Sequence, residues 1–118
     1  MPYESNLLYA DRVIDVRFIG DVTIAERLAV MQLIVRAHHE TDYTRLLLDF
    51  STARVQEGTH EELRRYAEHL AREPLIHKMT IAYVGSTEQT ANVEGMAALH
   101  GYFYQRFPTR DSALRWLQ

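Results

Sequence analysis

Segments with the period of a β-strand alternate along this chain with segments of helical period, and this alternation constrains the fold most. Strand-like segments are expected at residues 6–10, 13–19, 46–50, 79–84 and 106–108. A helix between two strands favours their parallel pairing, whereas the short connection at residues 10–12 favours a hairpin. The order β-β-α-β-α-β-α-β-α predicts an α/β fold. Its central sheet is mostly parallel, with an antiparallel N-terminal edge hairpin, and four helices flank it.

The predicted helices have recognisable starts. A Ser or Thr followed three residues later by Glu or Gln forms a capping box, in which two side chains satisfy backbone donors at a helix start. The pairs are Thr23 with Glu26, Thr59 with Glu62, and Ser86 with Gln89. Thr109 is expected to cap the closing helix. Apolar residues follow each cap at helical spacing. In the third helix they are Val93, Met96, Leu99 and Phe103.

Acidic residues occur in two of the predicted strands. In the second strand, Asp15 and Arg17 share one side with Val13, so we expect only the opposite side to be covered. Asp49 stands near the end of the apolar run at residues 46–50. Ligands of open α/β sheets bind beyond the carboxyl ends of strands. For Asp49 we nevertheless favour a structural bond to the following residues, Ser51 and Thr52.

Composition bounds the class of protein. The 118 residues predict a single domain over residues 1–118, and 47% hydrophobic with 25% charged residues argues against disorder. The chain has no cysteine, which excludes disulfides and thiol chemistry. A net charge of −3 argues against nucleic-acid binding. The longest stretch without charged residues, residues 95–105, is too short to span a membrane. We expect a cytoplasmic protein with no transmembrane segment.

Six histidines raise the question of a metal site. A helical metal site needs ligands three or four residues apart on one face. His38 and His39 are adjacent and diverge, and His60 and His69 are nine residues apart. We therefore expect neither a metal nor another cofactor.

Catalytic and phosphate-binding motifs are absent from the sequence. It contains no G-x-S-x-G elbow, no Walker A loop and no G-x-G-x-x-G. Ser86 follows a strand and Gly85, where a helix start could bind an anion. A hydrolase or isomerase using His60, Asp49 or Ser86 stays an alternative, and it requires two of these side chains at one cleft.

Aromatic residues gather near the C-terminus. Tyr102, Phe103, Tyr104 and Phe107 precede Trp116, and three consecutive aromatics on a helix cannot all face one core. The cluster could form a pocket mouth or a subunit interface. The alternative is that the rings lie over the core with solvated hydroxyls.

Five segments in order resemble a known family. The chain is similar to the STAS domain of sulfate transporters and anti-sigma factor antagonists, and within it to the SpoIIAA-like branch of small STAS/SEC14-type bacterial proteins. The segments are residues 20–23, 47–51, 79–85, 106–109 and 113–117, the last with the pattern A-L-x-W-L. No single motif is sharp, and their order and spacing carry the resemblance over almost the whole chain.

The resemblance implies a small cytoplasmic module without catalytic activity, often a homodimer, that binds an apolar small molecule or a protein partner. The candidate binding residues that it suggests are Ser51, Thr52, Gly58, Thr59, Gly85, Ser86 and Tyr102. The antagonist branch is regulated by phosphorylation of a serine in an Asp-Ser-Ser-Gly segment. The corresponding residues here are 57–60, in which Thr59 is the only hydroxyl and so the alternative phosphoacceptor.

Overall fold

The computed structural model describes residues 3–56, 58–85 and 103–118. The described elements, in chain order, are β1 (Tyr3–Leu8), β2 (Val13–Val22), α1 (Ile24–Thr41), β3 (Arg45–Val55), α2 (His60–Arg72), the 3₁₀ helix η1 (Pro74–Lys78), β4 (Thr80–Val84), β5 (Phe103–Phe107) and α4 (Arg110–Leu117). The predicted order of strands and helices is confirmed within these ranges.

The strands form one five-stranded sheet in the order β1-β2-β3-β4-β5. β1 pairs antiparallel with β2, and every other neighbouring pair is parallel. Val16 of β2 lies opposite Leu48 of β3, and Leu48 lies opposite Tyr83 of β4. The mostly parallel sheet with an antiparallel edge hairpin is therefore confirmed.

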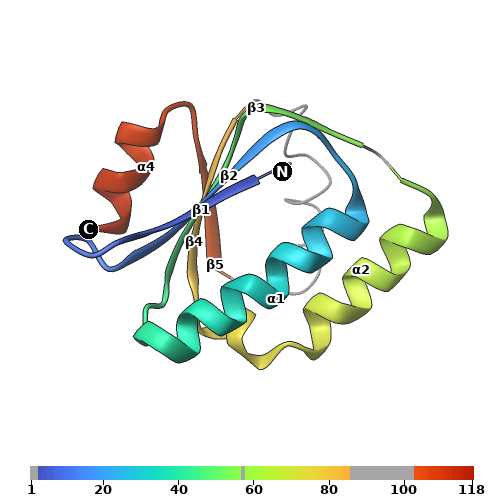
Figure 1. Cartoon of the computed structure of the whole chain (residues 1–118), viewed down its shortest axis with the longest axis horizontal. Coiled ribbons are helices and arrows are strands. Elements are labelled where there is room, and N and C mark those ends of the chain that lie inside the picture. The colour runs from blue at the N-terminus through green and yellow to red at the C-terminus, as the bar shows by residue number, and fades with distance from the viewer. Residues whose placement is uncertain (1–2, 57, 86–102) are drawn as a thin grey trace.

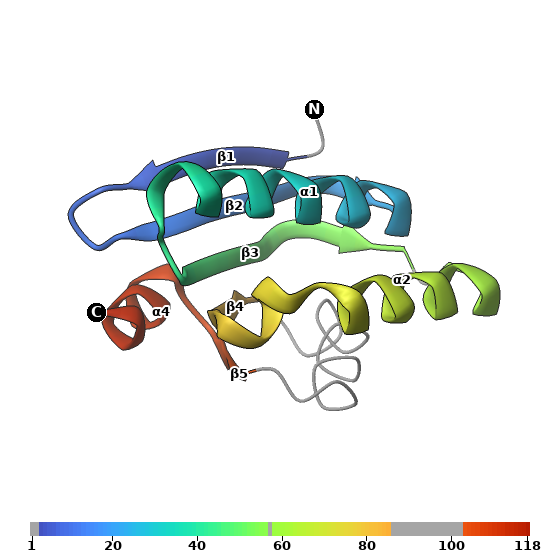
Figure 2. The same cartoon turned by 90° about the horizontal axis from the view of Figure 1, so that it is seen from below.

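Helices cover both faces of this sheet. Figures 1 and 2 show α1 and α2 side by side on one face and α4 on the other. The prediction that β2 is covered on one face only is wrong, because Val13 and Asp15 are buried on the α4 side. The charge of Asp15 suggested an exposed face, but an ion pair described below compensates it.

The N-terminal caps of the helices follow the sequence. Thr23 and Glu26 form the predicted capping box of α1, and Thr59 and Glu62 exchange the same two hydrogen bonds at the start of α2. The Thr109 side chain accepts from the Ser112 backbone N–H at the start of α4. Each cap satisfies backbone donors that would otherwise lack partners.

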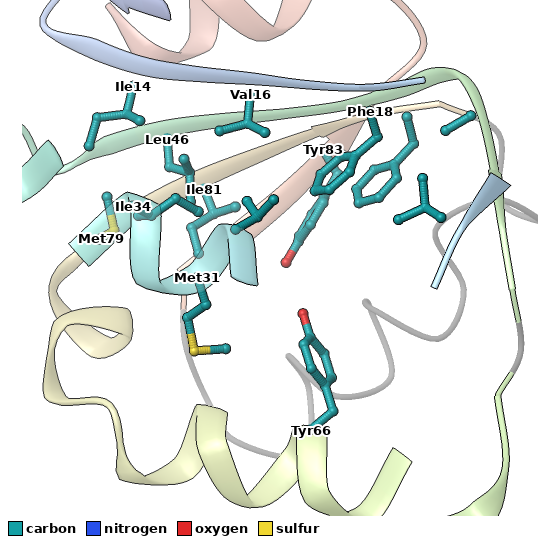
Figure 3. Close-up of a cluster of buried hydrophobic side chains, with 14 of the residues drawn as sticks. Ile14, Val16, Phe18, Met31, Ile34, Leu46, Tyr66, Met79, Ile81 and Tyr83 are labelled. Carbon is teal, nitrogen blue, oxygen red and sulfur yellow. The ribbon is translucent and has the colours of Figure 1, made fainter. Parts of the chain in front are cut away.

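The larger core lies between the sheet and the α1–α2 layer (Figure 3). Aromatic rings cross this side of the sheet from strand to strand. Phe18 and Phe50 stack with their centroids 4.5 Å apart. Phe50 lies 6.3 Å from Tyr83, which meets Tyr104 edge to face at 5.8 Å. We call Phe18, Phe50, Tyr83 and Tyr104 the aromatic row.

One prediction needs correction at the C-terminal end, and another lies outside the described residues. Three α-helices lie within the described ranges, and the expected third helix, with Ser86 and Gln89, falls on residues outside them. Phe103, assigned to that helix, instead begins β5, because an alternating pattern over residues 103–107 was mistaken for a helical stripe. The aromatic cluster is thereby divided. Tyr104 joins the aromatic row, and Phe107 contacts Trp116 on the α4 side.

Candidate functional site

Two arginines near opposite faces of the sheet are the main candidates for recognition of a charged group. Arg110, the first residue of α4, binds two buried acids. Its Nη2 donates to Asp15 Oδ2 at 2.8 Å, and its Nη1 donates to Asp49 Oδ2 at 2.8 Å and to Asp15 Oδ1 at 3.1 Å. The Asp15 and Asp49 side chains are almost completely buried. The guanidinium therefore joins α4 to both β2 and β3.

The remaining Asp49 oxygen is also occupied. Asp49 Oδ1 accepts from the Ser51 backbone N–H at 2.9 Å and from the Ser51 hydroxyl at 2.6 Å. Arg17 Nε lies 3.7 Å from Asp49 Oδ2. Burial by itself raises the pKa of the Asp49 carboxyl, but the hydrogen bonds from Ser51 and Arg110 outweigh it and hold the pKa below its ordinary value. The hydrogen bond to Asp15 contributes most to raising the pKa of Arg110.

We call Asp15, Asp49, Arg110, Arg17 and Ser51 the α4 ion cluster. Its two carboxylates face two guanidinium groups, so its formal charges balance. An ionised acid whose oxygens already accept from Ser51 and Arg110 is a poor general base. The predicted structural bond between Asp49 and Ser51 is confirmed, and the cluster docks α4 on the sheet.

Arg27 of α1 is in the opposite situation. It is 3% exposed, and its Nε, Nη1 and Nη2 atoms are all buried. Among the residues that the structure describes, no acceptor takes a hydrogen bond from any of these nitrogens. The buried acids on the described part of the chain, Asp15 and Asp49, belong to the α4 ion cluster. The guanidinium therefore has no counter-ion from these residues.

Tyr66 of α2 is the neighbour that Arg27 does have. Arg27 Cζ lies 4.8 Å from the centroid of the Tyr66 ring, in a cation–π contact. Burial raises the pKa of the Tyr66 hydroxyl, and the nearby Arg27 only partly counteracts this, so Tyr66 is a neutral phenol. Figure 3 shows the Tyr66 hydroxyl directed toward that of Tyr83 in the aromatic row.

Magnitudes show that Tyr66 does not compensate the burial of Arg27. Taking a guanidinium out of water without a counter-ion costs several kcal/mol even after relaxation. A cation–π contact returns about 0.5–2 kcal/mol, and each hydrogen bond that a buried donor fails to make costs about 1–3 kcal/mol. The chain therefore carries a local energetic penalty at Arg27, which an anion from outside the chain would relieve. We call Arg27 and Tyr66, with the aromatic row toward which the Tyr66 hydroxyl points (Figure 3), the Arg27 site.

The residues proposed from the resemblance are not gathered in one place. Ser51 and Thr52 lie within a strand, because β3 extends to Val55. Ser51 belongs to the α4 ion cluster, and the Thr52 hydroxyl donates to the Phe18 carbonyl at 3.1 Å. β3 runs beyond the apolar run because residues 52–55 pair with residues 19–22 of β2.

Gly58 and Thr59 serve the start of α2. Gly58 has φ +72°, which favours glycine, and a Cβ there would overlap Ile24 Cδ1. The Thr59 hydroxyl accepts from the Glu62 backbone N–H at 3.1 Å as part of the capping box. Gly85 ends β4 with φ +143° and donates from its backbone to the Phe107 carbonyl at 3.4 Å. Ser86 and Tyr102 lie outside the described residues.

The residues of the hydrolase alternative are likewise separated where the structure describes them. Asp49 lies in the α4 ion cluster, whereas His60 is an exposed residue at the start of α2 in the opposite layer. Within residues 3–56, 58–85 and 103–118, no group of His, Asp and Glu is arranged to hold a metal ion. No helix in these ranges is long and apolar enough to cross a membrane.

A polar cleft lies at the other end of α1, where the chain enters β3. Its lining residues are Arg12, Thr41, Asp42, Tyr43, Thr44 and Arg45. All of them are exposed or half-buried, and Arg45 Nη1 already donates to the Asp11 carbonyl at 3.1 Å. The cleft offers no buried polar group without a partner, unlike the Arg27 site.

The analysis of the sequence missed Arg27, although a signal was present. Arg27 stands three residues after Ile24 and four before Met31, both of which are buried. A charged residue at that spacing lies within the apolar stripe of the helix and points toward the core.

The similarity of this chain to known proteins lies in its fold. No protein-family model matches the sequence, and no curated protein does. The structure resembles the crystal structure of an uncharacterized DUF3478-family protein with a SpoIIAA-like fold from Shewanella loihica PV-4, with a TM-score of 0.66 and 14% sequence identity. The match covers 98% of this chain and 92% of that one. The expected SpoIIAA-like fold is thereby confirmed, and at this identity the likeness shows the fold alone.

Proposed function

We propose that this SpoIIAA-like domain is a cytoplasmic binding module without catalytic activity, and that it holds a small organic molecule between the α1–α2 layer and the sheet. The observation that carries the proposal is the buried guanidinium of Arg27, which has no acceptor among the described residues. Small-molecule sites place a few polar groups among apolar and aromatic side chains to orient the ligand, and a buried polar group without a partner calls for an explanation of this kind. The Tyr66 ring supplies aromatic surface beside it, and the Tyr66 hydroxyl points toward Tyr83 of the aromatic row (Figure 3).

The α2 helix is suited to admit such a molecule. Of its side chains that the structure describes, Tyr66 is buried and Leu63 is partly buried, whereas α1 buries five residues. Tyr66 makes this helix one wall of the Arg27 site. Moving α2 would expose the Arg27 site without disturbing the α4 ion cluster on the other face.

The phosphoregulator and the hydrolase are less well supported than the binding module. The Thr59 hydroxyl already caps α2, and a phosphate on it would displace that cap. His60 and Asp49 lie in different layers of the fold. These observations favour binding, without a chemical step, as the role of the domain.

Native mass spectrometry of the protein as purified, repeated under denaturing conditions, tests the proposal. We expect an additional mass that is retained natively and released on denaturation, and the subunit count from the same spectra tests the expected homodimer. Calorimetric titration with the neutral apolar probe 2-naphthamide gives a second measure. Absence of both a released mass and probe binding would refute the binding module.

Two matched variants locate the molecule. Tyr66→Ala removes an aromatic ring from the Arg27 site, and Trp116→Ala removes one from the α4 side, where it contacts Phe107. We expect Tyr66→Ala to lose the retained mass and probe binding and Trp116→Ala to keep both. The reverse result would place the ligand on the other face. Circular dichroism verifies that both variants are folded.

A further inference from the structure

The Arg27 site also indicates which chemical class of molecule it would take. We infer that the ligand is an aromatic monocarboxylate, whose carboxylate forms a two-point ion pair with the Arg27 guanidinium and whose ring packs against Tyr66 and the aromatic row. The inference rests on the proposed binding function and adds the ligand's charge, its head group and the aromatic character of the rest of the molecule, which we call its body.

The charge follows from the balance of buried groups. The α4 ion cluster contains two acids and two arginines, so it neither needs nor supplies charge. On the α1–α2 side, Arg27 is the only charged side chain that is buried among the described residues. One negative charge neutralises it, whereas a doubly charged group would leave one buried charge without compensation.

The head group follows from the donors. A guanidinium presents its N–H groups in a planar fork that matches the two oxygens of a carboxylate. Nε, Nη1 and Nη2 of Arg27 are all without an acceptor among the described residues, so a two-point contact costs the protein no existing hydrogen bond. Arg110 shows the same fork in use, since it donates through both terminal nitrogens to Asp15.

The body follows from the surroundings. Arg27 lies 4.8 Å from the Tyr66 ring centroid, and the Tyr66 hydroxyl is directed toward Tyr83 of the aromatic row (Figure 3). Flat rings pack against such surfaces with a favourable offset or edge-on geometry. Tyr66 carries no charge that would repel an incoming anion. A planar apolar body directly attached to the carboxylate therefore suits both parts of the site.

Calorimetric titration with two probes of equal shape tests the charge. The probes are 2-naphthoate and neutral 2-naphthamide, and each is titrated into the wild type and into Arg27→Met. We expect the wild type to bind 2-naphthoate about tenfold or more tightly than 2-naphthamide, as for hydrogen bonds to charged groups. In Arg27→Met this preference should vanish, because the affinity for 2-naphthoate falls while the affinity for 2-naphthamide stays the same.

Further variants and probes keep the test decisive. Arg65→Met removes an exposed α2 arginine paired with Glu61 and should leave both affinities unchanged. Arg27→Lys keeps the positive charge but removes the planar guanidinium, so it should retain only part of the preference for 2-naphthoate over 2-naphthamide. This variant replaces Arg27→Met in the test if Arg27→Met does not fold. 2-Naphthyl phosphate, which carries up to two charges, should bind more weakly than 2-naphthoate, and octanoate should bind more weakly than its aromatic counterpart.

The outcomes separate this inference from the proposed function. Equal binding of 2-naphthoate and 2-naphthamide, or a preference that survives in Arg27→Met, overturns the carboxylate while the binding module stands. Tighter binding of the phosphate overturns the head group, and tighter binding of octanoate overturns the aromatic body. Failure of every probe overturns the inference, and the proposed function fails with it only if denaturation also releases no bound mass.

Discussion

Two arginines lie near opposite faces of the sheet, and only one of them has its counter-ions among the described residues. Arg110 donates to Asp15 and Asp49 on the α4 side of the sheet. Arg27, on the α1–α2 side, has a Tyr66 ring and no acceptor among the described residues. Removing the partner of a buried charge costs several kcal/mol, and a buried charge that has no partner lowers the free energy of unfolding.

The largest expected effect is that of removing Arg110. Arg110→Met leaves the buried carboxylates of Asp15 and Asp49 without their main partner, and we expect a loss of about 3–5 kcal/mol in the free energy of unfolding. Urea denaturation followed by circular dichroism measures it. Arg65→Met, at an exposed ion pair, is the matched control and should unfold at nearly the wild-type urea concentration. A loss no greater than that of the control would mean that the α4 ion cluster does not hold the helix.

Acid should weaken the same cluster. The pKa of Asp49 is lower in the folded protein than its ordinary value near 4. A lowered carboxyl pKa contributes stability that is fully present above the unfolded-state pKa and is lost as the pH falls through the folded-state pKa. We therefore expect the free energy of unfolding to fall as the pH drops below about 4.

The Ser51→Ala variant isolates the contribution of Asp49 to that acid response. It removes the hydroxyl that donates to Asp49 Oδ1 and keeps the Ser51 backbone N–H in place. The pKa of Asp49 should rise, so acid unfolding should begin at a higher pH than in the wild type. Denaturation curves collected between about pH 2 and pH 6 give the comparison. Identical acid midpoints for the two proteins would contradict the assignment.

Removing Arg27 should have the opposite sign to removing Arg110. In the ligand-free protein, Arg27→Met replaces a buried unpaired charge with an apolar side chain of similar length and loses only a cation–π contact. We expect the free energy of unfolding to stay the same or to increase by about 1–2 kcal/mol. The measurement is urea denaturation of protein refolded from denaturant, so that no bound molecule remains. A loss as large as that of Arg110→Met would show that Arg27 is structural.

The sequence alone predicted the elements whose structure depends on a local pattern of residues. Capping pairs such as Thr23 with Glu26 located helix starts, and strand periodicity located the sheet, because both depend on residues close in the chain. The sequence did not predict where a strand ends when that end depends on pairing with a neighbouring strand. β3 continues past Phe50 because β2 lies beside it, and residues 103–107 extend along β4. Arg110 could not be placed, since burial of its partner depends on residues far apart in the chain, and Asp15 and Arg110 are 95 positions apart.

The smallest expected change in the free energy of unfolding comes from the N-terminal caps of α2 and α4, which lie on the two faces of the sheet. Thr59→Ala removes the side-chain acceptor at the exposed start of α2 and should cost about 1 kcal/mol. Thr109→Ala removes the equivalent acceptor at the start of α4, immediately before Arg110, so it also loosens the guanidinium that binds Asp15 and Asp49. We therefore expect the Thr109 variant to be the less stable of the two in urea, and Thr→Ser at either position to restore most of the loss. The double variant Thr109→Ala with Arg110→Met sharpens the test. If the cap acts through Arg110, the double variant loses less free energy of unfolding than the sum of the two single losses. A loss equal to that sum would make the cap independent of the α4 ion cluster.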